Sequence, residues 1–256
     1  MKNSYSNIFT FNKKNLKKTI KNLSIGKVIG LPTETVYGLG GNAYSKGSIQ
    51  KIFKLKGRPK TNPLIIHYYN VNYAMEDVVL NEYFKKLYKK FCPGPITFIL
   101  KKKKNSKVHS SARAGLNTVG VRFPKHKIAR SILKEIKFPL AMPSANKSTS
   151  VSPVSSKDVY EEFKKKISLI LDGGKCKIGI ESTVVDLTNN PKILRPGIIN
   201  KNKIEKALKL KISNTNHHKK NRSPGMMKKH YSPGIPVLIN QKKNDGKSAF
   251  IYLGNK

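Results

Sequence analysis

Residues 30–68 of this 256-residue chain have the sequence GLPTETVYGLGGNAYSKGSIQKIFKLKGRPKTNPLIIHY. An apolar strand is expected to end where the hydroxyl-bearing residues 33–35 begin, an amphipathic helix follows, and a second apolar strand ends at His67. The glycines Gly38, Gly40 and Gly41 predict a turn with positive φ, in which a ligand approaches backbone N–H groups. This layout indicates a binding site, and a solvated loop between two core elements is the alternative.

A rigid basic turn follows the helix. Lys56, Arg58 and Lys60 alternate with Gly57 and Pro59, an arrangement suited to phosphate oxygens. Neither common phosphate-loop pattern, GxxxxGK[ST] or GxGxxG, occurs in the chain. The turn is therefore a candidate phosphate site of another kind.

Several later strands are also expected to end in polar segments bounded by glycine or proline. These strands cover residues 97–100, 118–123, 139–142, 168–171, 182–187 and 192–195. Helices are expected between them, so the pattern predicts a mixed α/β fold. Strand ends that converge on one crevice are how α/β sheets build ligand sites.

The charge of the chain is extreme, with 52 basic residues against 13 acidic ones and a net charge of +39. Such a balance predicts a polyanionic partner, but lysine and asparagine enrichment along the whole chain is also typical of an A+T-rich coding sequence. Only six residues are arginines, and Arg58, Arg122 and Arg195 each lie in a motif bounded by glycine or proline. A planar guanidinium at such places favours bidentate binding of phosphate or carboxylate.

Cysteine and hydrophobic patterns exclude several classes of protein. Cys92 and Cys176 form no CxxC motif, and the six histidines have no HExxH spacing, so no metal site is predicted. The sequence contains no run of 18 or more apolar residues that could span a membrane. Its N-terminus also lacks the continuous apolar region of a secretory signal. The cytoplasm is therefore the expected compartment.

Composition also suggests where the chain divides. A lysine-rich helix is expected at residues 203–210, and residues 213–234 have the composition of a linker. Residues 235–256 are too few to bury a core by themselves.

With these segments assembled, the chain resembles the YrdC-like family, and specifically threonylcarbamoyl-AMP synthases. The motifs that carry the resemblance are GLPTETVYGLG, KGRPKTNPLIIH, PGPITFIL, VGVRFP, PSANKS, ESTVVDL and LRPG, with SPGMMKKHYSP in the linker. The resemblance implies a twisted mixed sheet flanked by helices around a basic concave crevice. It also implies that residues 12–200 form one catalytic domain and residues 201–234 a helix and a linker. Residues 235–256 would begin a Rossmann-like C-terminal domain.

The resemblance further implies a reaction. L-threonine, bicarbonate and ATP, with Mg²⁺ on the phosphates, would give L-threonylcarbamoyladenylate and pyrophosphate. A separate transferase would then use this product to make N6-threonylcarbamoyladenosine in tRNA. Chemistry at phosphorus of this kind depends mainly on positioning and charge neutralisation.

Roles of individual residues follow from their positions in the family motifs. The residues expected to act in catalysis are Lys56, Arg58, Ser144 and Asn146. Those expected on the threonine side are Thr35, His67, Arg122, Ser144 and Ser182. Those expected on the ATP side are Lys56, Arg58, Asn62, Thr118, Asn146, Val154, Arg195 and the linker residue Tyr231, which would close as a lid.

Alternatives remain open both for individual residues and for the function of the whole chain. Thr118 could simply complete the hydrogen bonding at a strand end, and Ser182 could be an ordinary hydroxyl of a turn. His67 could be an ordinary buried histidine at the end of a strand. For the whole chain, one alternative is a module of the same fold that binds RNA without chemistry, with weak tRNA binding as a milder form. Another is a carbamoyltransferase domain that makes carbamoyl-adenylate without threonine.

Overall fold

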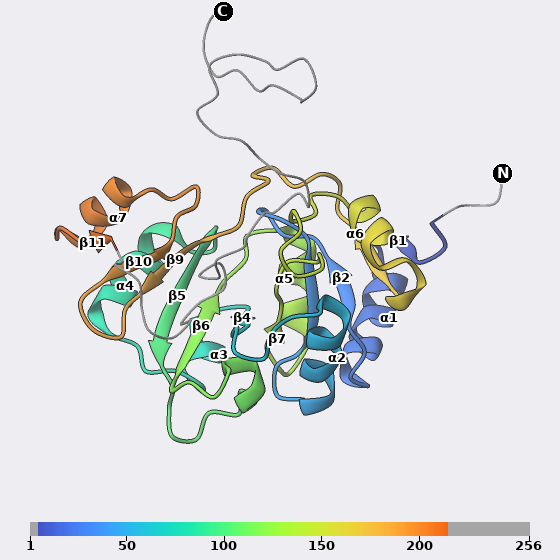
Figure 1. Cartoon of the computed structure of the whole chain (residues 1–256), viewed down its shortest axis with the longest axis horizontal. Helices are drawn as coiled ribbons and strands as arrows, with labels where there is room; N and C mark the ends of the chain where they lie inside the picture. Colours follow the sequence, from blue (N-terminus) through green and yellow to red (C-terminus); the bar gives the residue numbers. More distant parts are fainter. Residues whose placement is uncertain (1–4, 215–256) are drawn as a thin grey trace, which may run out of the picture.

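The computed structural model describes residues 5–214, and Figure 1 shows one mixed sheet with helices against it. Within these residues the sheet has 11 strands in the order β1-β8-β2-β3-β7-β4-β6-β5-β9-β10-β11. The strands are β1 Ile8–Thr10, β2 Ile29–Leu31, β3 Gly38–Asn42, β4 Ile65–His67, β5 Ile96–Lys101, β6 Thr118–Arg122, β7 Leu140–Ala141, β8 Ile170–Asp172, β9 Thr183–Asp186, β10 Lys192–Arg195 and β11 Ser213–Asn214. Parallel and antiparallel neighbours are both present, as the α/β pattern predicts.

The helices begin at residues whose side chains accept a hydrogen bond from the first turn. Asn12, Ser45, Asn81, Ser155 and Asn200 do this for α1, α2, α4, α6 and α7. The helices are α1 Lys13–Ser24, α2 Lys46–Lys56, α3 Val71–Ala74, α4 Glu82–Phe91, α5 Lys127–Glu135, α6 Ser156–Phe163 and α7 Lys201–Leu208, with 3-10 turns at Ser110–Arg113 and Lys164–Lys166. In this described part, every helix is too short or too polar to cross a bilayer.

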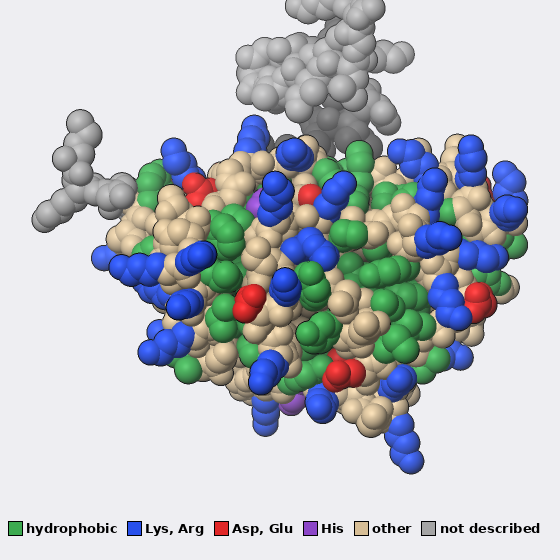
Figure 2. Space-filling model, turned by 180° about the vertical axis from the view of Figure 1, so that it is seen from behind, with side chains coloured by type: hydrophobic (Ala, Val, Ile, Leu, Met, Phe, Trp, Pro, Cys, Tyr) green, Lys and Arg blue, Asp and Glu red, His purple; other side chains and the backbone are tan. Residues whose placement is uncertain are grey.

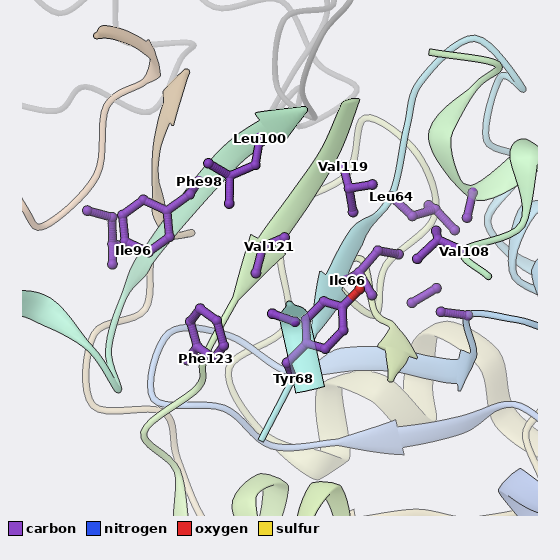
Figure 3. Packing of buried hydrophobic residues seen from close by; sticks show 14 of the residues in the cluster. Leu64, Ile66, Tyr68, Ile96, Phe98, Leu100, Val108, Val119, Val121 and Phe123 are labelled. Carbon is purple, nitrogen blue, oxygen red and sulfur yellow. The ribbon is translucent and has the colours of Figure 1, made fainter. Parts of the chain in front are cut away.

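The central strands pack the hydrophobic core on one face and carry polar side chains on the other. Figure 3 shows Ile66 and Tyr68 of the β4 segment packed with Val121 and Phe123 of the β6 segment on one face. Because side chains alternate along a strand, His67 and Arg122 lie on the opposite face, and these two residues are paired across β4 and β6. The alternation that builds the core therefore also places two polar side chains together.

The glycine-rich segment after β2 differs from the prediction. Residues 38–42 form strand β3, which pairs with β2 and β7, and Gly38, Gly40 and Gly41 do not have positive φ. Their lack of a side chain matters for packing instead, because a Cβ on Gly38 would lie 2.4 Å from the Cγ of Met142. The prediction of a turn was wrong because the segment is paired on both sides, with the nearby β2 and with β7, which lies about 100 positions later in the sequence.

The sheet extends beyond residues 12–200 at both ends. β1 pairs in parallel with β8, and the Asn7 side chain before it donates to the carbonyl oxygens of Lys164 and Ile167. β11 pairs in parallel with β10. The described part therefore forms one sheet from β1 to β11.

Candidate active site

A pocket opens on the sheet face that carries His67 and Arg122. It holds about 760 Å³ of space, including the part open to solvent. Its walls come from the β2–β3 loop, the end of α2, β4, β6, the loop after β7 and the ends of β9 and β10. The residues that line it are Thr33, Val36, Tyr37, Gly38, Lys56, Arg58, Asn62, Ile65, His67, Arg122, Met142, Pro143, Ser144, Asn146, Ser148, Thr149, Ser150, Glu181 and Arg195.

Lys56 and Arg58 form one end of the pocket. Helix α2 ends at Gly57, whose φ of 58° turns the chain so that the two basic residues flank the cap. Lys56 Nζ donates to the carbonyl oxygens of Ser144, at 2.5 Å, and Asn146. Arg58 Nε donates to the Asn62 carbonyl at 2.9 Å, and Arg58 Nη2 donates to Asn62 Oδ1 at 2.6 Å.

Burial disfavours the charge on both of these side chains. It lowers the pKa of Lys56 to about 7; the neighbouring Arg58 adds to this effect, and the carboxylates of Glu181 and Glu162 oppose it. Burial likewise lowers the pKa of Arg58 to about 10, although the Glu181 carboxylate opposes the shift. An anionic ligand at this end would therefore stabilise the charged forms of both side chains.

Arg122 forms the opposite end and is held by the β2–β3 loop. Its Nη2 donates to Glu34 Oε1 at 2.8 Å and to Thr35 Oγ1 at 2.7 Å. The other oxygen of Glu34 accepts from the backbone N–H of Lys125 at 2.9 Å. Burial alone would raise the pKa of Glu34, but the charge and hydrogen bond of Arg122 outweigh burial and lower it. Glu34 thus stays ionised and fixes the guanidinium.

His67 lies beside Arg122 and is uncharged near neutral pH. Burial and the neighbouring Arg122 lower the pKa of His67 to about 3, and its Nδ1 lies 3.3 Å from the Ile65 carbonyl oxygen. A neutral ring whose Nδ1–H donates to a carbonyl leaves Nε2 as an acceptor.

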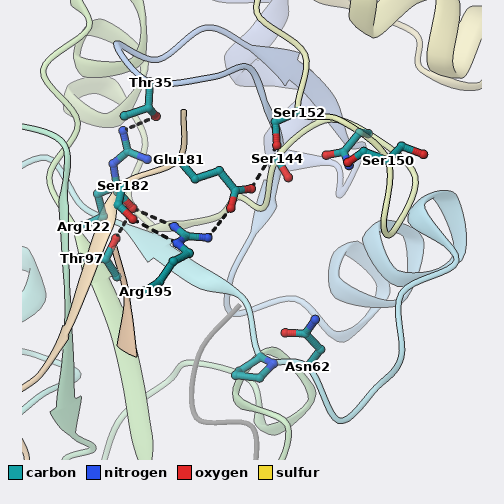
Figure 4. A network of polar contacts seen from close by, with 12 residues as sticks. Thr35, Asn62, Thr97, Arg122, Ser144, Ser150, Ser152, Glu181, Ser182 and Arg195 are labelled. Atoms are coloured by element: carbon teal, nitrogen blue, oxygen red, sulfur yellow. Dashed lines mark hydrogen bonds and ion pairs between the residues drawn. The ribbon is translucent and has the colours of Figure 1, made fainter. Parts of the chain in front are cut away.

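A third side of the pocket is formed by residues that are joined in a network of polar contacts, shown in Figure 4. Ser152 donates to Glu181 at 3.2 Å, and Arg195 Nη1 contacts the other Glu181 oxygen at 2.5 Å. Arg195 Nη2 donates to Ser182 Oγ at 3.1 Å, which lies 2.8 Å from Thr97 Oγ1. The network joins β5, β9, β10 and the loop after β7.

The structure gathers most of the predicted site residues. Those that line the pocket are Lys56, Arg58, Asn62, His67, Arg122, Ser144, Asn146 and Arg195. Thr35 and Ser182 are fully buried behind this layer, where they contact Arg122 and Arg195.

Two further predicted residues, Thr118 and Val154, lie away from the pocket wall, and a third cannot be compared. Thr118 begins β6, at the end opposite Arg122, and does not line the pocket. Val154 does not line it either, and its N–H donates to the helix-capping Asp158 at 2.9 Å. Tyr231 lies outside the described residues.

Two acidic residues were not among the predicted site residues. Glu34 and Glu181 have no paired-carboxylate spacing, so no catalytic pattern pointed to them. Each contacts an arginine far along the chain, and that contact exists only once the sheet is formed. The signal that could have been used is their position next to Thr35 and Ser182, at two strand boundaries.

Comparison with known proteins agrees with this geometry. A model of the Sua5/YciO/YrdC family, described as "Telomere recombination", matches residues 21–197. A second model, described as "Threonylcarbamoyl-AMP synthase, C-terminal domain", matches residues 199–253.

Individual relatives give the same result. Proteins named threonylcarbamoyl-AMP synthase from Pyrococcus abyssi and Bacillus subtilis are 41% and 39% identical over 84% and 83% of this chain. The chain spans only 64% and 63% of their lengths. The crystal structure of P. abyssi Sua5 complexed with L-threonine matches with a TM-score of 0.84 and 38% identity, over 88% of this chain and 68% of that one. The chain therefore belongs to the Sua5/YciO/YrdC family.

Proposed function

We propose that this chain is a threonylcarbamoyl-AMP synthase. The observation that carries the proposal is a single pocket with two differently equipped basic ends, Arg122 at one and Lys56 with Arg58 at the other. One end suits the carboxylate of an amino acid, and the other suits a chain of phosphates. The names of the relatives and the threonine complex of P. abyssi Sua5 support this assignment.

At the amino-acid end, Arg122 would bind the threonine carboxylate. Its Nη2 is used by Glu34 and Thr35, whereas its buried Nε has no partner among the described residues. A carboxylate oxygen in the pocket would satisfy this Nε–H. The neutral ring of His67 would accept a hydrogen bond from threonine, and Ser182 would support this side from behind.

At the phosphate end, Lys56 and Arg58 would bind the triphosphate together with Ser144 and Asn146. Arg58 uses Nε and Nη2 to hold residues 62 and 63, and none of the hydrogen bonds within residues 5–214 uses its Nη1. Asn62, Thr118, Val154, Arg195 and, as a lid, Tyr231 are proposed for the rest of the nucleotide.

The chemistry consists of two steps. The threonine amine attacks bicarbonate, water leaves, and a carbamate forms on the nitrogen. A carbamate oxygen then attacks the α-phosphorus of ATP, and pyrophosphate leaves. Lys56 and Arg58 would neutralise the charge that the departing pyrophosphate carries.

Magnesium is proposed to arrive with ATP. Residues 5–214 contain no group of three or more His, Cys, Asp or Glu side chains that could hold a metal ion. Glu181 is the one carboxylate among the lining residues of the pocket, and it already contacts Arg195 and Ser152. These residues fit an ion held mainly by phosphate oxygens, whose role would be to neutralise phosphate charge.

The biological setting is proposed along the same lines. The adenylate would pass to a separate transferase that acts on tRNA, and the reaction would take place in the cytoplasm. Residues 12–200 would carry the catalysis, with residues 201–234 as helix and lid-forming linker and residues 235–256 as the start of a C-terminal domain.

The test is an assay of the purified full chain with ATP, bicarbonate and Mg²⁺, with and without L-threonine. Pyrophosphate and the threonylcarbamoyl adduct should appear only when threonine is present. Equal turnover without threonine would favour the carbamoyl-adenylate alternative.

RNA binding without chemistry is the remaining alternative. On the face seen in Figure 2, Lys and Arg side chains are spread widely rather than gathered in one stripe. Such a distribution favours charge that is unrelated to one binding groove. Salt-dependent RNA affinity in a protein that releases no pyrophosphate would support this alternative.

A further inference from the structure

Four buried side-chain atoms in the described residues have no hydrogen-bond partner. They are Asn7 Oδ1, Ser48 Oγ, Arg122 Nε and Ser148 Oγ. Two of the four, Arg122 and Ser148, belong to residues that line the pocket. A buried polar atom without a partner costs stability, so such atoms in a pocket wall indicate where a ligand completes the bonding.

The loop that carries Ser148 is fixed to the phosphate end of the pocket. The backbone N–H of Ser148 donates to the carbonyl oxygen of Lys56 at 2.8 Å. Lys56 Nζ in turn donates to the carbonyl oxygens of Ser144 and Asn146. These reciprocal bonds tie the loop that carries Ser148 to the last residue of α2.

The loop is held tightly around Ser148. The Asn146 side chain donates to the carbonyl oxygens of Lys147, at 2.7 Å, and Ser150, at 2.8 Å. Thr149 has a φ of 78°, a strained conformation for a β-branched residue. Strain of this kind is retained where the surrounding structure fixes a group for a ligand.

From these contacts we propose that Ser148 is a further phosphate-binding residue, whose hydroxyl donates a hydrogen bond to an oxygen of the triphosphate. The proposal rests on the function proposed above and adds a residue to it. A hydroxyl fits here because an anionic phosphate oxygen accepts strongly, and Lys56 and Arg58 line the same pocket and would attract the phosphate.

The experiment compares the full-length protein with Ser148→Ala and with Ser48→Ala as a matched control. Ser48 also has a buried, unpartnered hydroxyl, but it lies on α2 and does not line the pocket. Calorimetric titrations would use ATP with Mg²⁺, inorganic tripolyphosphate and L-threonine. Thermal unfolding of each unliganded protein would be recorded in parallel.

Ser148→Ala should bind ATP and tripolyphosphate about tenfold more weakly, since a hydrogen bond to a charged oxygen is lost. Its threonine affinity and its unliganded melting temperature should not fall. Ser48→Ala should bind all three ligands like the unmodified protein. Ser148→Thr keeps the hydroxyl and should recover most of the lost affinity.

Other results would overturn the proposal in distinguishable ways. Unchanged tripolyphosphate affinity in Ser148→Ala would remove Ser148 from the phosphate site and leave the proposed function standing. An equal loss of threonine affinity would show general damage to the pocket. If the unmodified protein bound neither ATP nor tripolyphosphate, the proposed function itself would fail.

Discussion

The two ends of the pocket differ in how the charge of their cationic side chains is compensated. At the Arg122 end a carboxylate, Glu34, lies 2.8 Å from the guanidinium and is itself held by backbone N–H groups. At the Lys56 end, Lys56 and Arg58 donate to carbonyl and amide oxygens, and burial lowers the pKa of both although the charge of Glu181 opposes this shift.

The difference indicates two kinds of binding. The Arg122 end is already neutralised, so it can orient a ligand with little change in its own electrostatics. The charge at the Lys56 end is opposed by burial and only partly compensated by Glu181, so a polyanion would stabilise it further. Selectivity for the amino acid would then come from shape and hydrogen bonding, and affinity for the nucleotide from charge.

The largest expected effect tests the phosphate end directly. Arg58→Ala should lower the rate of threonine-dependent pyrophosphate release by about 100-fold or more, because a charge that stabilises the leaving group is removed. Threonine affinity, measured by calorimetry, should change by less than about twofold. Lys60→Ala is the control, since Lys60 lies in the same turn but is exposed. Equal losses in both variants would mean that the charge of the whole turn matters and not Arg58.

The next test concerns the ion pair of Glu34 and Arg122 at the opposite end of the pocket. Glu34→Gln should lower the free energy of unfolding by about 3 kcal/mol, because it leaves the buried Arg122 charge without its carboxylate. Denaturant unfolding measures this change. The exposed pair of Glu82 and Lys85 provides the control, and Glu82→Gln should leave stability unchanged.

The Glu34 pair also has a defined dependence on pH. The pKa of Glu34 in the folded protein is below its ordinary value of 4.5. Its stabilisation is therefore fully present above about pH 4.5 and is lost as pH falls through the folded pKa. In Glu34→Gln this part of the acid destabilisation should be absent.

A smaller effect is expected from the titration of Lys56. Its pKa of about 7 means that the unliganded protein loses this proton as pH rises above 7. Bound phosphate would raise that pKa, so ATP binding should take up a proton and weaken by up to about tenfold per pH unit above 7. Titrations in buffers of different ionisation enthalpy measure the proton directly. Lys56→Met should bind ATP weakly at every pH and take up no proton, whereas persistent uptake would assign the titration to another group.

The smallest effect is expected behind the pocket. Thr97→Val keeps the shape of the side chain and removes the hydroxyl that contacts Ser182 Oγ at 2.8 Å. Stability should fall by about 1 kcal/mol, and the affinities for ATP and threonine should change by less than about twofold. A large loss of either affinity would show that the network reaches the ligands more directly than its buried position indicates.

Much of the site could be predicted from sequence because its residues stand at the ends of strands. Because side chains alternate along β6, Arg122 lies on the other face of the sheet from Val121 and Phe123. Any strand with this sequence pattern would separate its polar and apolar side chains in the same way. Helix α2 and its cap follow from Ser45 and Gly57. These features depend on neighbours only a few residues away.

The features that could not be predicted depend on distant partners. Glu34 and Arg122 are 88 positions apart, and nothing in the spacing of either residue shows that they meet. The segment of Gly38, Gly40 and Gly41 has the composition of a turn, but β2 and β7 supply hydrogen-bonding partners on both sides. Tertiary pairing overrides local preference there.

Gly38 also matters for anyone who redesigns the range of ligands that would fit this pocket. A Cβ at this position would meet Met142 Cγ at 2.4 Å and Met142 Sδ at 2.8 Å, and both residues line the pocket. Any side chain placed at residue 38 must therefore displace Met142, and the displaced thioether would take up ligand space. In engineering terms, residue 38 sets an upper limit on pocket size that cannot be raised by substituting it. Met142 is the wall position whose shortening would create room.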